Sequence, residues 1–383
     1  MIRIGIDASN ISSGGGVTHL SEILNALDLQ RMGIRSIDIW SNKKMLSKIE
    51  PKEGIRLNSH PALEKCLMKR FYWQQYTLTS IARKNYDILY IPGGSYLGSF
   101  RPFVTMNRNL QPFDNEVRKK YNLSFQKFRL VLLEKIQAYT YRRAGGVIFL
   151  SEEAKKVTLE KIGNGCNNVV TIPHGIAPKF FKEPKEQLPI NAYSFKNPFR
   201  ILYASRINIY KHQWNVIEAI NTLRREGYAV VLDLVGNIEN RQSHILLQKA
   251  LKKFDPKSKF VHYHGRINQS QLLEFYHNAD AFVFASSCET FGQILLEAMA
   301  SALPIACSER SAMPEILKDS GLYFDPECPK SISRELRKLL KSKKLRQHLS
   351  NSAHKRAKTY SWETCAANTF NFIKSVYKEH RRL

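Results

Sequence analysis

Short apolar runs rich in β-branched residues alternate with longer amphipathic stretches along almost the whole chain. Continuous apolar runs are typical of parallel strands that helices cover on both faces, and their alternation with helical patterns is typical of βαβ units. The expected strands are residues 2–6, 36–40, 87–91, 102–106, 146–150 and 169–172 in the first half, and residues 201–204, 230–235, 260–263, 281–285, 304–307 and 322–324 in the second. Two such sets predict two doubly wound α/β domains.

The stretch 178–198 separates the two sets. It carries four prolines and no clear periodicity, which is typical of a connection between domains. We expect an N-terminal domain over residues 1–185, a C-terminal domain over 186–360, and a helix over 361–383 that packs back toward the N-terminal domain. Ligands of open α/β sheets bind beyond the carboxyl ends of the strands. Two such domains facing each other across a cleft would therefore carry their chemistry in the loops that follow strands.

The chain is strongly basic, with 59 Lys and Arg against 33 Asp and Glu and a formal net charge of +26. Such a surface attracts nucleic acid, anionic lipid or phosphorylated substrates, and charge alone does not choose among them. Basic and aromatic residues mix over 115–144, which suits an anionic membrane surface and equally a helix packed on its own sheet.

Several features point to the cytoplasm. No uncharged apolar run approaches the roughly 18–20 residues of a membrane span, and Asp7 stands too early for a signal-peptide core. The six cysteines form no CxxC pair, so we expect free thiols in a reducing compartment and no zinc site. We therefore expect a cytoplasmic protein.

Two cations, Arg206 and Lys211, stand in the loop after the strand 201–204. Arg presents a planar fork and Lys a point charge, and together they can hold a diphosphate. The alternative is a pair of solvated surface cations.

Two carboxylates, Glu289 and Glu297, follow the strand 281–285, with a helix expected to start near Gly292. The unpaired N–H groups at a helix start favour an anion, and glycine lets a ligand approach the backbone. A sugar nucleotide across this helix start would place its sugar hydroxyls near one carboxylate and its ribose hydroxyls near the other. The alternative is Glu289 as a helix cap and Glu297 as a surface residue, but a carboxylate in so apolar a helix needs a partner.

The segment from Glu289 to Ala300 resembles the E-x7-E signature of retaining glycosyltransferases of family 4, the group 1 family of GT-B fold. Arg206 to Lys211 resembles the family's G-R-x4-K clamp, with Ala204-Ser205 in place of the glycine-containing lead-in. Further matches, in order along the chain, are Ile172-Pro173-His174-Gly175-Ile176, Val235-Gly236, residues 260–265 and Pro314-Glu315-Ile316. The resemblance covers nearly the whole chain and is strongest over residues 199–326.

The resemblance implies a GT-B fold of two Rossmann-like domains and a division of roles in the C-terminal one. Glu289 would hold the donor sugar's hydroxyls, Glu297 the nucleotide ribose, and Arg206 with Lys211 the donor diphosphate. The implied catalytic residues are Glu289, Arg206 and Lys211. The other implied donor contacts in this domain are Gly236, His264, Gly265, Phe291, Gly292 and Gln293.

The first half contributes a glycine-rich loop, Gly14 to Gly16, ahead of a helix. Its spacing does not fit the G-x-G-x-x-G of nicotinamide binding, and it resembles the family's first loop near the donor phosphates, so Gly15 and Gly16 are expected donor contacts. A plain flexible loop is the alternative.

The segment that follows strand 102–106 is where the family often carries a His, which is absent here. The expected acceptor-side residues are Asn107, Arg108 and Asn109, together with His174, and Arg108 could contact a phosphate.

The sequence thus predicts transfer of a sugar from a nucleotide-diphosphate donor to a hydroxyl of a saccharide or lipid-linked saccharide, with retention of anomeric configuration, in bacterial cell-surface polysaccharide synthesis. A nucleotide sugar is the expected co-substrate, with no separate cofactor. No D-x-D pair occurs, so no metal is invoked. We expect peripheral association with the cytoplasmic face of the inner membrane and no nucleic-acid partner. The alternatives are a sugar-nucleotide epimerase of the same fold and a basic nucleic-acid-binding protein.

Overall fold

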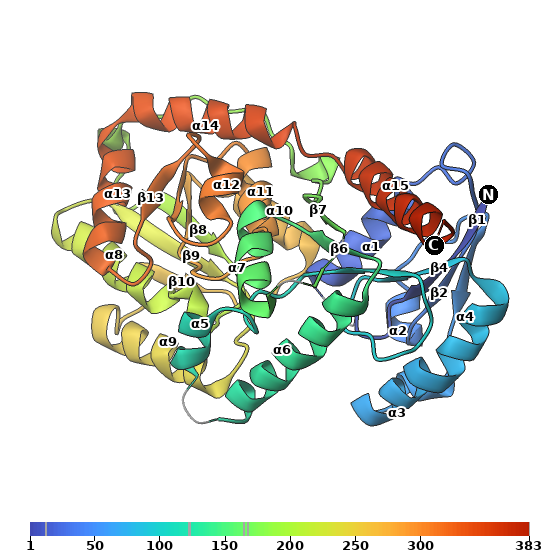
Figure 1. Ribbon diagram of the computed structural model, residues 1–383. Coiled ribbons are helices and arrows are strands. Elements are labelled where there is room, and N and C mark those ends of the chain that lie inside the picture. Colours follow the sequence, from blue (N-terminus) through green and yellow to red (C-terminus); the bar gives the residue numbers. More distant parts are fainter. Residues whose placement is uncertain (12–13, 122–123, 164, 167, 383) are drawn as a thin grey trace. The chain divides into compact units, whose positions relative to one another are not determined.

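The computed structural model describes residues 1–11, 14–121, 124–163, 165–166 and 168–382. The chain divides into two compact units. The first consists of Met1–Arg118, Asn122–Gly175 and Ser361–Leu383, and the second of Lys119–Tyr121 and Ile176–Tyr360. Each unit is built around one parallel sheet (Figure 1).

The first unit's sheet has seven parallel strands among the described residues, in the order β3-β2-β1-β4-β5-β6-β7. Its central strands are wholly buried, because helices cover both faces. The strands are β1 (Ile2–Asp7), β2 (Ile34–Trp40), β3 (Ile55–Asn58), β4 (Ile88–Ile91), β5 (Phe103–Met106), β6 (Gly146–Phe149) and β7 (Val169–Thr171).

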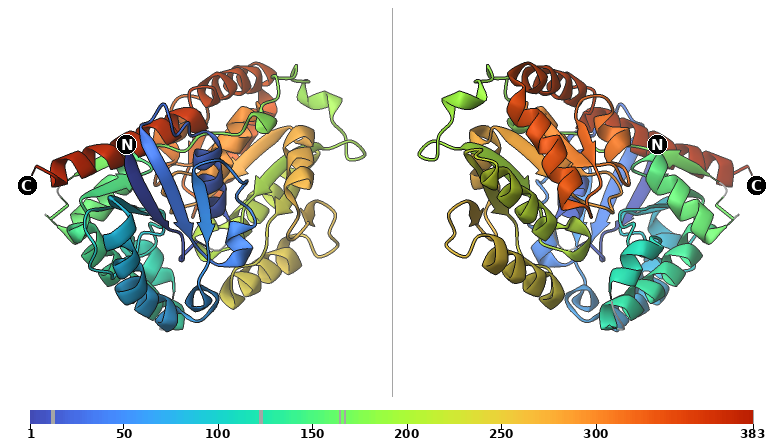
Figure 2. Two further views of the ribbon diagram at one scale, coloured as in Figure 1. Left: turned by 90° about the vertical axis from the view of Figure 1, so that its right-hand side faces the viewer. Right: turned by 90° about the vertical axis from the view of Figure 1, so that its left-hand side faces the viewer.

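The helices of the first unit lie mostly between successive strands. The last of them, α15, is red in Figures 1 and 2 and packs against α1 and strands β4 to β6. The helical elements are α1 (Gly15–Asn25), α2 (Lys43–Leu46), η1 (Pro61–Glu64), α3 (Leu67–Tyr72), the π-helical η2 (Trp73–Leu78), α4 (Thr79–Asn85), α5 (Asn115–Lys120, whose last two residues belong to the second unit), α6 (Phe125–Arg143), α7 (Glu152–Ile162) and α15 (Trp362–His380).

The second unit's sheet has six parallel strands in the order β10-β9-β8-β11-β12-β13. These strands are β8 (Phe199–Ala204), β9 (Val230–Val235), β10 (Val261–Tyr263), β11 (Ala281–Phe284), β12 (Ile305–Ser308) and β13 (Leu322–Phe324). The helical elements are η3 (Pro178–Phe180), η4 (Ile190–Ala192), η5 (Ile209–Lys211), α8 (Gln213–Arg225), α9 (Arg241–Phe254), α10 (Gln269–Asn278), α11 (Gln293–Ala300), α12 (Met313–Leu317), α13 (Pro329–Lys341) and α14 (Lys343–Ala357).

The structure differs from the sequence-based expectation in three places. Strand β3 was not predicted, because it is an edge strand without an apolar run, and its Arg56 reaches sideways to Asp38 at 2.6 Å. The single helix expected over 115–144 is two helices, α5 and α6. The first unit ends at Gly175 and not at 185, because Lys182 and Lys185 donate to the backbone carbonyls of His277 and Ala279 in the second unit.

Candidate functional site

The topology of the second sheet brings two loops together. Strands β8 and β11 are neighbours although they are far apart in the sequence, so the direction of strand order reverses between them. Ligands of open α/β sheets bind at such a switch point, beyond the carboxyl ends of the strands. The loops that follow β8 and β11 are joined by Ser287, whose backbone N–H donates to the Tyr210 carbonyl at 2.8 Å.

Lys211 and Glu289, one from each of these loops, form an ion pair. The Lys211 side chain is only 7% exposed, and its ammonium lies 4.8 Å from the centre of the Phe284 ring. Ser286 Oγ also donates to the Glu289 carboxylate, at 2.7 Å. A buried cation and a partly exposed carboxylate, both predicted to bind the donor, therefore balance each other's charge.

Hydroxyl and backbone groups fix the loop that carries Glu289. Ser311 Oγ accepts from the Glu289 N–H at 2.9 Å and donates to its carbonyl at 2.7 Å. The carboxylate is thus held by its backbone and by Ser286 as well as by Lys211.

Arg206 is placed differently. Its side chain is half exposed and pairs with Glu239, with both carboxylate oxygens 3.3 Å from Nη1. A surface ion pair of this kind contributes about 0–1 kcal/mol and exchanges easily with an anionic ligand. The structure therefore brings Lys211 and Glu289 into contact, and it leaves Arg206 paired elsewhere.

Helix α11 begins at Gln293, and the residue before it, Gly292, has a φ of 90° and no side chain to cap the helix start. This left-handed backbone conformation favours glycine, and a Cβ at this position would lie 2.8 Å from Met313 Cε, at the end of a flexible side chain. The neighbouring predicted residue Phe291 is buried, with its ring against Tyr360.

Glu297, near the end of α11, accepts a hydrogen bond from the Tyr276 hydroxyl at 3.0 Å. Burial raises the pKa of Glu297 to about 7, although the Tyr276 bond acts in the opposite direction. The carboxyl therefore has a partner, as its apolar surroundings require, and it titrates close to neutral pH.

The predicted donor contacts after β9 and β10 form a compact turn. The Gly236 N–H donates to the Gly265 carbonyl at 2.8 Å, and a Cβ on Gly236 would lie 2.1 Å from the Ser205 carbonyl oxygen. His264 Nε2 lies 2.8 Å from Asp233. Packing within the unit is enough to explain glycine at 236, so its role toward a donor stays a prediction.

The predicted residues of the first unit lie in the glycine-rich loop and in the segment after β5. Gly16 lies directly against the Arg108 guanidinium, whereas Gly15 has open space where a Cβ would stand. Asn107 is fully buried and donates to Thr158 at 3.1 Å, so its side chain supports the core, and Asn109 Oδ1 accepts from the Gln111 N–H at 3.2 Å.

His174 stacks on His19, with ring centres 4.7 Å apart. Sequence reasoning missed His19. The sequence shows that His19 follows the glycine-rich loop, but it does not show that His19 is buried against His174, which lies far along the chain.

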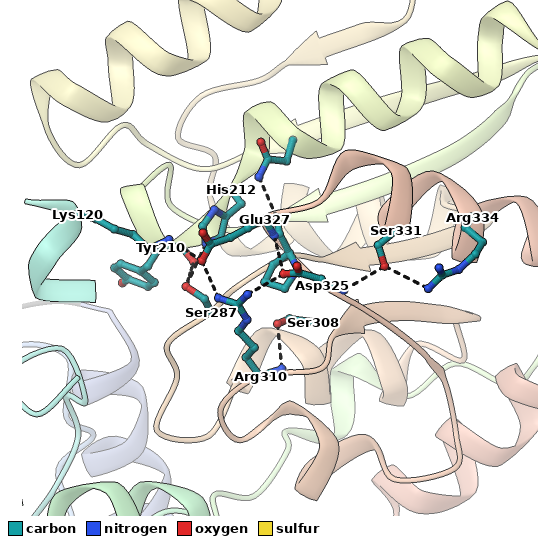
Figure 3. Close-up of polar contacts among 12 residues, drawn as sticks. Lys120, Tyr210, His212, Ser287, Ser308, Arg310, Asp325, Glu327, Ser331 and Arg334 are labelled. Carbon is teal, nitrogen blue, oxygen red and sulfur yellow. Dashed lines mark hydrogen bonds and ion pairs between the residues drawn. The ribbon is translucent and has the colours of Figure 1, made fainter. Parts of the chain in front are cut away.

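An ion network beside the Lys211 loop was also missed (Figure 3). Glu327 pairs with both Lys120 and Arg310 at 2.6 Å, and Arg310 pairs with Asp325 at 2.8 Å. Lys120 is the last residue of α5, Arg310 follows β12, and Asp325 and Glu327 follow β13, so the network joins the end of α5 to two loops at one edge of the second sheet.

His212 lies next to this network and immediately after Lys211. It adopts a left-handed backbone with a φ of 51°, and its Nε2 lies 3.0 Å from Ser287 Oγ (Figure 3). Burial lowers the pKa of His212 to about 3, and the nearby Lys120 acts in the same direction. His212 is therefore neutral at physiological pH, and its link to Ser287 joins the two loops a second time.

No group of three or more His, Cys, Asp or Glu side chains in the described part of the chain is placed to hold a metal ion. No described helix is long and apolar enough to cross a bilayer.

Two parallel sheets of this topology define a GT-B-like glycosyltransferase fold. Sucrose-phosphate synthase from Thermosynechococcus elongatus has a TM-score of 0.76 and 17% identity, over 99% of this chain and 100% of that one. HepE from Anabaena, in complex with UDP and glucose, has a TM-score of 0.72 and 15% identity, over 98% of this chain and 100% of that one.

Residues 185–356 match the family described as glycosyl transferases group 1. O-antigen chain mannosyltransferase B of Escherichia coli is 24% identical over 250 residues, which are 65% of each chain. The chain therefore spans a little less than two thirds of that relative's length. The match to group 1 glycosyl transferases over residues 185–356 confirms the predicted family for this part of the chain, and the structural likeness confirms the predicted pair of parallel α/β units.

Proposed function

We propose that the protein is a retaining glycosyltransferase that moves a sugar from a nucleotide-diphosphate donor to a hydroxyl of a saccharide or lipid-linked saccharide in bacterial cell-surface polysaccharide synthesis. The observation that carries the proposal is the pairing of Lys211 with Glu289 at the switch point of the second sheet, beside the start of α11. Support comes from HepE, whose structure holds UDP and glucose, and from the O-antigen mannosyltransferase relative.

The charges of this site suit a departing diphosphate. In the reaction the bond between the sugar's anomeric carbon and the diphosphate oxygen breaks, and a bond to the acceptor oxygen forms. Negative charge grows on the leaving diphosphate, which can take the acceptor's proton. Lys211, Arg206 and the start of α11 supply positive charge there, so they would stabilise the transition state more than the ground state.

Donor binding by these residues would exchange their present ion pairs for contacts with the donor. Sugar hydroxyls would take over the Glu289 carboxylate, while Lys211 would turn to the diphosphate. Arg206 would exchange Glu239 for the same diphosphate. Glu297 would accept hydrogen bonds from the ribose hydroxyls, because an ionised carboxylate accepts two of them well.

Helix α6 supports the proposed contact with an anionic membrane surface. Phe125, Phe128, Leu132 and Tyr139 are exposed, and their spacing of three, four and seven residues places them along one stripe. Exposed basic residues, Arg129 and Lys135, flank this stripe.

A second apolar stripe lies nearby in the sequence. Met68, Tyr72 and Tyr76 are exposed along α3 and η2, beside exposed Lys65 and Lys69, and α3 and α6 both reach the lower edge of the first unit in Figure 1. Apolar side chains with basic neighbours suit the headgroup region of an anionic bilayer better than open water. We propose that these stripes hold the protein at the cytoplasmic face of the membrane that carries its acceptor.

A thermal-shift screen with UDP-, GDP- and ADP-sugars tests the proposed donor class. One nucleotide should raise the melting temperature, since a ligand at 100 times its Kd adds about 2.7 kcal/mol of stability. No shift with any sugar nucleotide or nucleoside diphosphate would contradict the proposal.

Donor consumption without an acceptor would instead favour the epimerase, and EDTA should leave transfer unchanged.

A further inference from the structure

Two residues beside the Lys211–Glu289 pair have a backbone conformation that favours glycine. His212 has a φ of 51° and Ser311 a φ of 60°, both in the left-handed region. This region is unfavourable for a residue with a Cβ, and residues held in it gather at functional sites. The other described non-glycine residues with a positive φ are Ser258, Ala302 and Lys318. Of these five, His212 and Ser311 form side-chain hydrogen bonds to the loop that carries Glu289.

Ser311, which follows β12, holds the backbone of Glu289 itself. Its Oγ accepts from the Glu289 N–H at 2.9 Å and donates to the Glu289 carbonyl at 2.7 Å. The two bonds flank the Glu289 Cα, so they fix the direction in which the carboxylate leaves the loop. Glycine at position 311 would suit the backbone better, but it would provide neither bond.

His212, which follows Lys211, holds the same loop from the side of β8. Its ring is buried, and its Nε2 lies 3.0 Å from Ser287 Oγ (Figure 3). Ser287 Oγ donates to the Tyr210 carbonyl at 3.3 Å, so the His212 Nε2 is the donor to Ser287. Lys211 therefore stands between two residues, Tyr210 and His212, that are both bonded to the loop of Glu289.

The ion network of Figure 3 supports both left-handed residues from behind. Arg310 directly precedes Ser311 and pairs with Asp325 at 2.8 Å and with Glu327 at 2.6 Å. The charges of Glu327 and Arg310 also act on the pKa of His212, in opposite directions. His212 and Ser311 thus belong to one connected framework, although they follow different strands of the sheet.

We propose that His212 and Ser311 are positioning residues, which fix the Glu289 carboxylate relative to the Lys211 ammonium through the loop of residues 286–289. The unfavourable backbone conformation at both positions is offset by hydrogen bonds that glycine could not form. The effect on sugar transfer rests on the proposed function, because that function gives Glu289 and Lys211 their roles toward the donor. The effect on the ion pair itself does not depend on it.

The coupling to the ion pair can be measured without any ligand. Lys211→Met should lower the melting temperature of the wild type, because it leaves Glu289 without its cation. In a Ser311→Gly or His212→Gly background the same change should lower it roughly half as much or less, because Glu289 can then turn toward water. Both glycine variants should fold, since glycine suits their backbone conformation.

Ser258→Gly is the matched control for this measurement. Ser258 is an exposed residue of the same unit, and its φ of 48° is similar to those of His212 and Ser311. Lys211→Met should therefore lower the melting temperature of the Ser258→Gly protein by the full amount. An equal decrease in all of these backgrounds would overturn the proposal.

Transfer kinetics at saturating donor test the effect on the reaction. Ser311→Gly and His212→Gly should each lower kcat roughly tenfold or more, because small misplacements of reacting groups are costly, and Ser258→Gly should not. Ser311→Gly should leave nucleoside diphosphate affinity unchanged, since Glu289 is proposed to contact the sugar. Ser287→Ala removes the His212 bond from its other end, so it should act like His212→Gly, and the double variant should lose no more. Additive losses would overturn the role of His212.

The two experiments separate this proposal from the proposed function. If the glycine variants weaken the effect of Lys211→Met but the wild type transfers no sugar, the positioning of the ion pair stands and the proposed function is wrong. If the wild type transfers sugar and both glycine variants keep its kcat, the proposed function stands and the positioning proposal is overturned.

Discussion

The positions of Lys211 and Glu289 are predictable from the sequence, but their pairing with each other is not. The sequence places each in a loop after a strand and predicts a diphosphate contact for one and a sugar contact for the other. It does not predict that the two side chains pair with each other, because they are 78 residues apart and meet only where β8 and β11 lie side by side. The two side chains thereby balance each other's charge.

Glu297→Gln tests the titration of the carboxyl on α11. The folded-state pKa of about 7 lies above the ordinary glutamate value of 4.5, so the folded chain binds this proton more tightly than the unfolded chain. The stability that this provides is complete below pH 4.5 and is lost as the pH rises through 7. The loss is at most about 3 kcal/mol.

Melting temperatures between pH 5 and 8 measure this effect. The wild type should lose stability relative to Glu297→Gln as the pH rises across that range. The control Glu274→Gln, which removes an exposed carboxylate of the same unit, should run parallel to the wild type. A constant difference between Glu297→Gln and the wild type would show that the carboxyl titrates normally.

At the scale of elements, the start of α11 was predicted from the sequence to within one residue. The sequence predicts a helix beginning near Gly292, and the helix begins at Gln293 with Gly292 in the left-handed region. What the sequence does not reveal is the contact with Met313, which the α12 segment brings to within reach of this turn. The left-handed backbone is the constraint that favours glycine, because the methyl end of the Met313 side chain can move aside.

Gly292→Ala separates the helix start's role in binding from its role in folding. Gly227 is the matched control, because its φ of 91° is nearly the same and nothing lies within 4 Å of its missing Cβ. Both alanine variants should lose roughly 1 kcal/mol from the left-handed backbone. Only Gly292→Ala should also weaken nucleoside diphosphate binding, as measured by calorimetry, and equal binding in both variants would remove α11 from the site.

The exposed stripe of α6 carries a prediction about membranes. Phe125→Ser combined with Phe128→Ser should weaken sedimentation with phosphatidylglycerol vesicles roughly tenfold or more, since two aromatic side chains no longer leave water. The control, Leu188→Ser with Ile245→Ser, removes two exposed apolar side chains of the second unit and should bind normally. Equal binding of both double variants, or no preference for anionic vesicles in the wild type, would contradict the membrane proposal.

At the scale of the whole molecule, periodicity predicted most of the fold. All six strands of the second sheet were expected near their observed positions, because each lies in an apolar run, although the edge strands β10 and β13 are only partly buried. Strand β3 was not predicted, because an edge strand has a solvent-facing side and needs no apolar run. The break between α5 and α6 escaped because local periodicity continues through it, while Lys120 and Tyr121 are held in the second unit by Glu327 and Asn208.

The candidate site was less predictable than the fold. The order of the motifs along the chain was enough to predict Arg206, Lys211, Glu289 and Glu297 as donor contacts. Partners depend on side chains that tertiary structure brings together, which is why Ser286, Ser311, Tyr276 and His19 were missed. The net charge of +26 was equally ambiguous, since it fits a phosphorylated ligand and a lipid surface alike.

The central claim is that the cations of the second unit stabilise a departing diphosphate. The most direct measurement is kcat at saturating donor for Arg206→Ala and Lys211→Met, with Arg225→Ala as an exposed control of the same unit. Loss of either cation should lower kcat roughly 100-fold or more, as is typical when a group aimed at developing charge is removed. Lys211→Met should also lower the melting temperature, because it leaves Glu289 without its cation. Turnover close to that of the wild type in both variants, with Arg225→Ala behaving identically, would contradict the account.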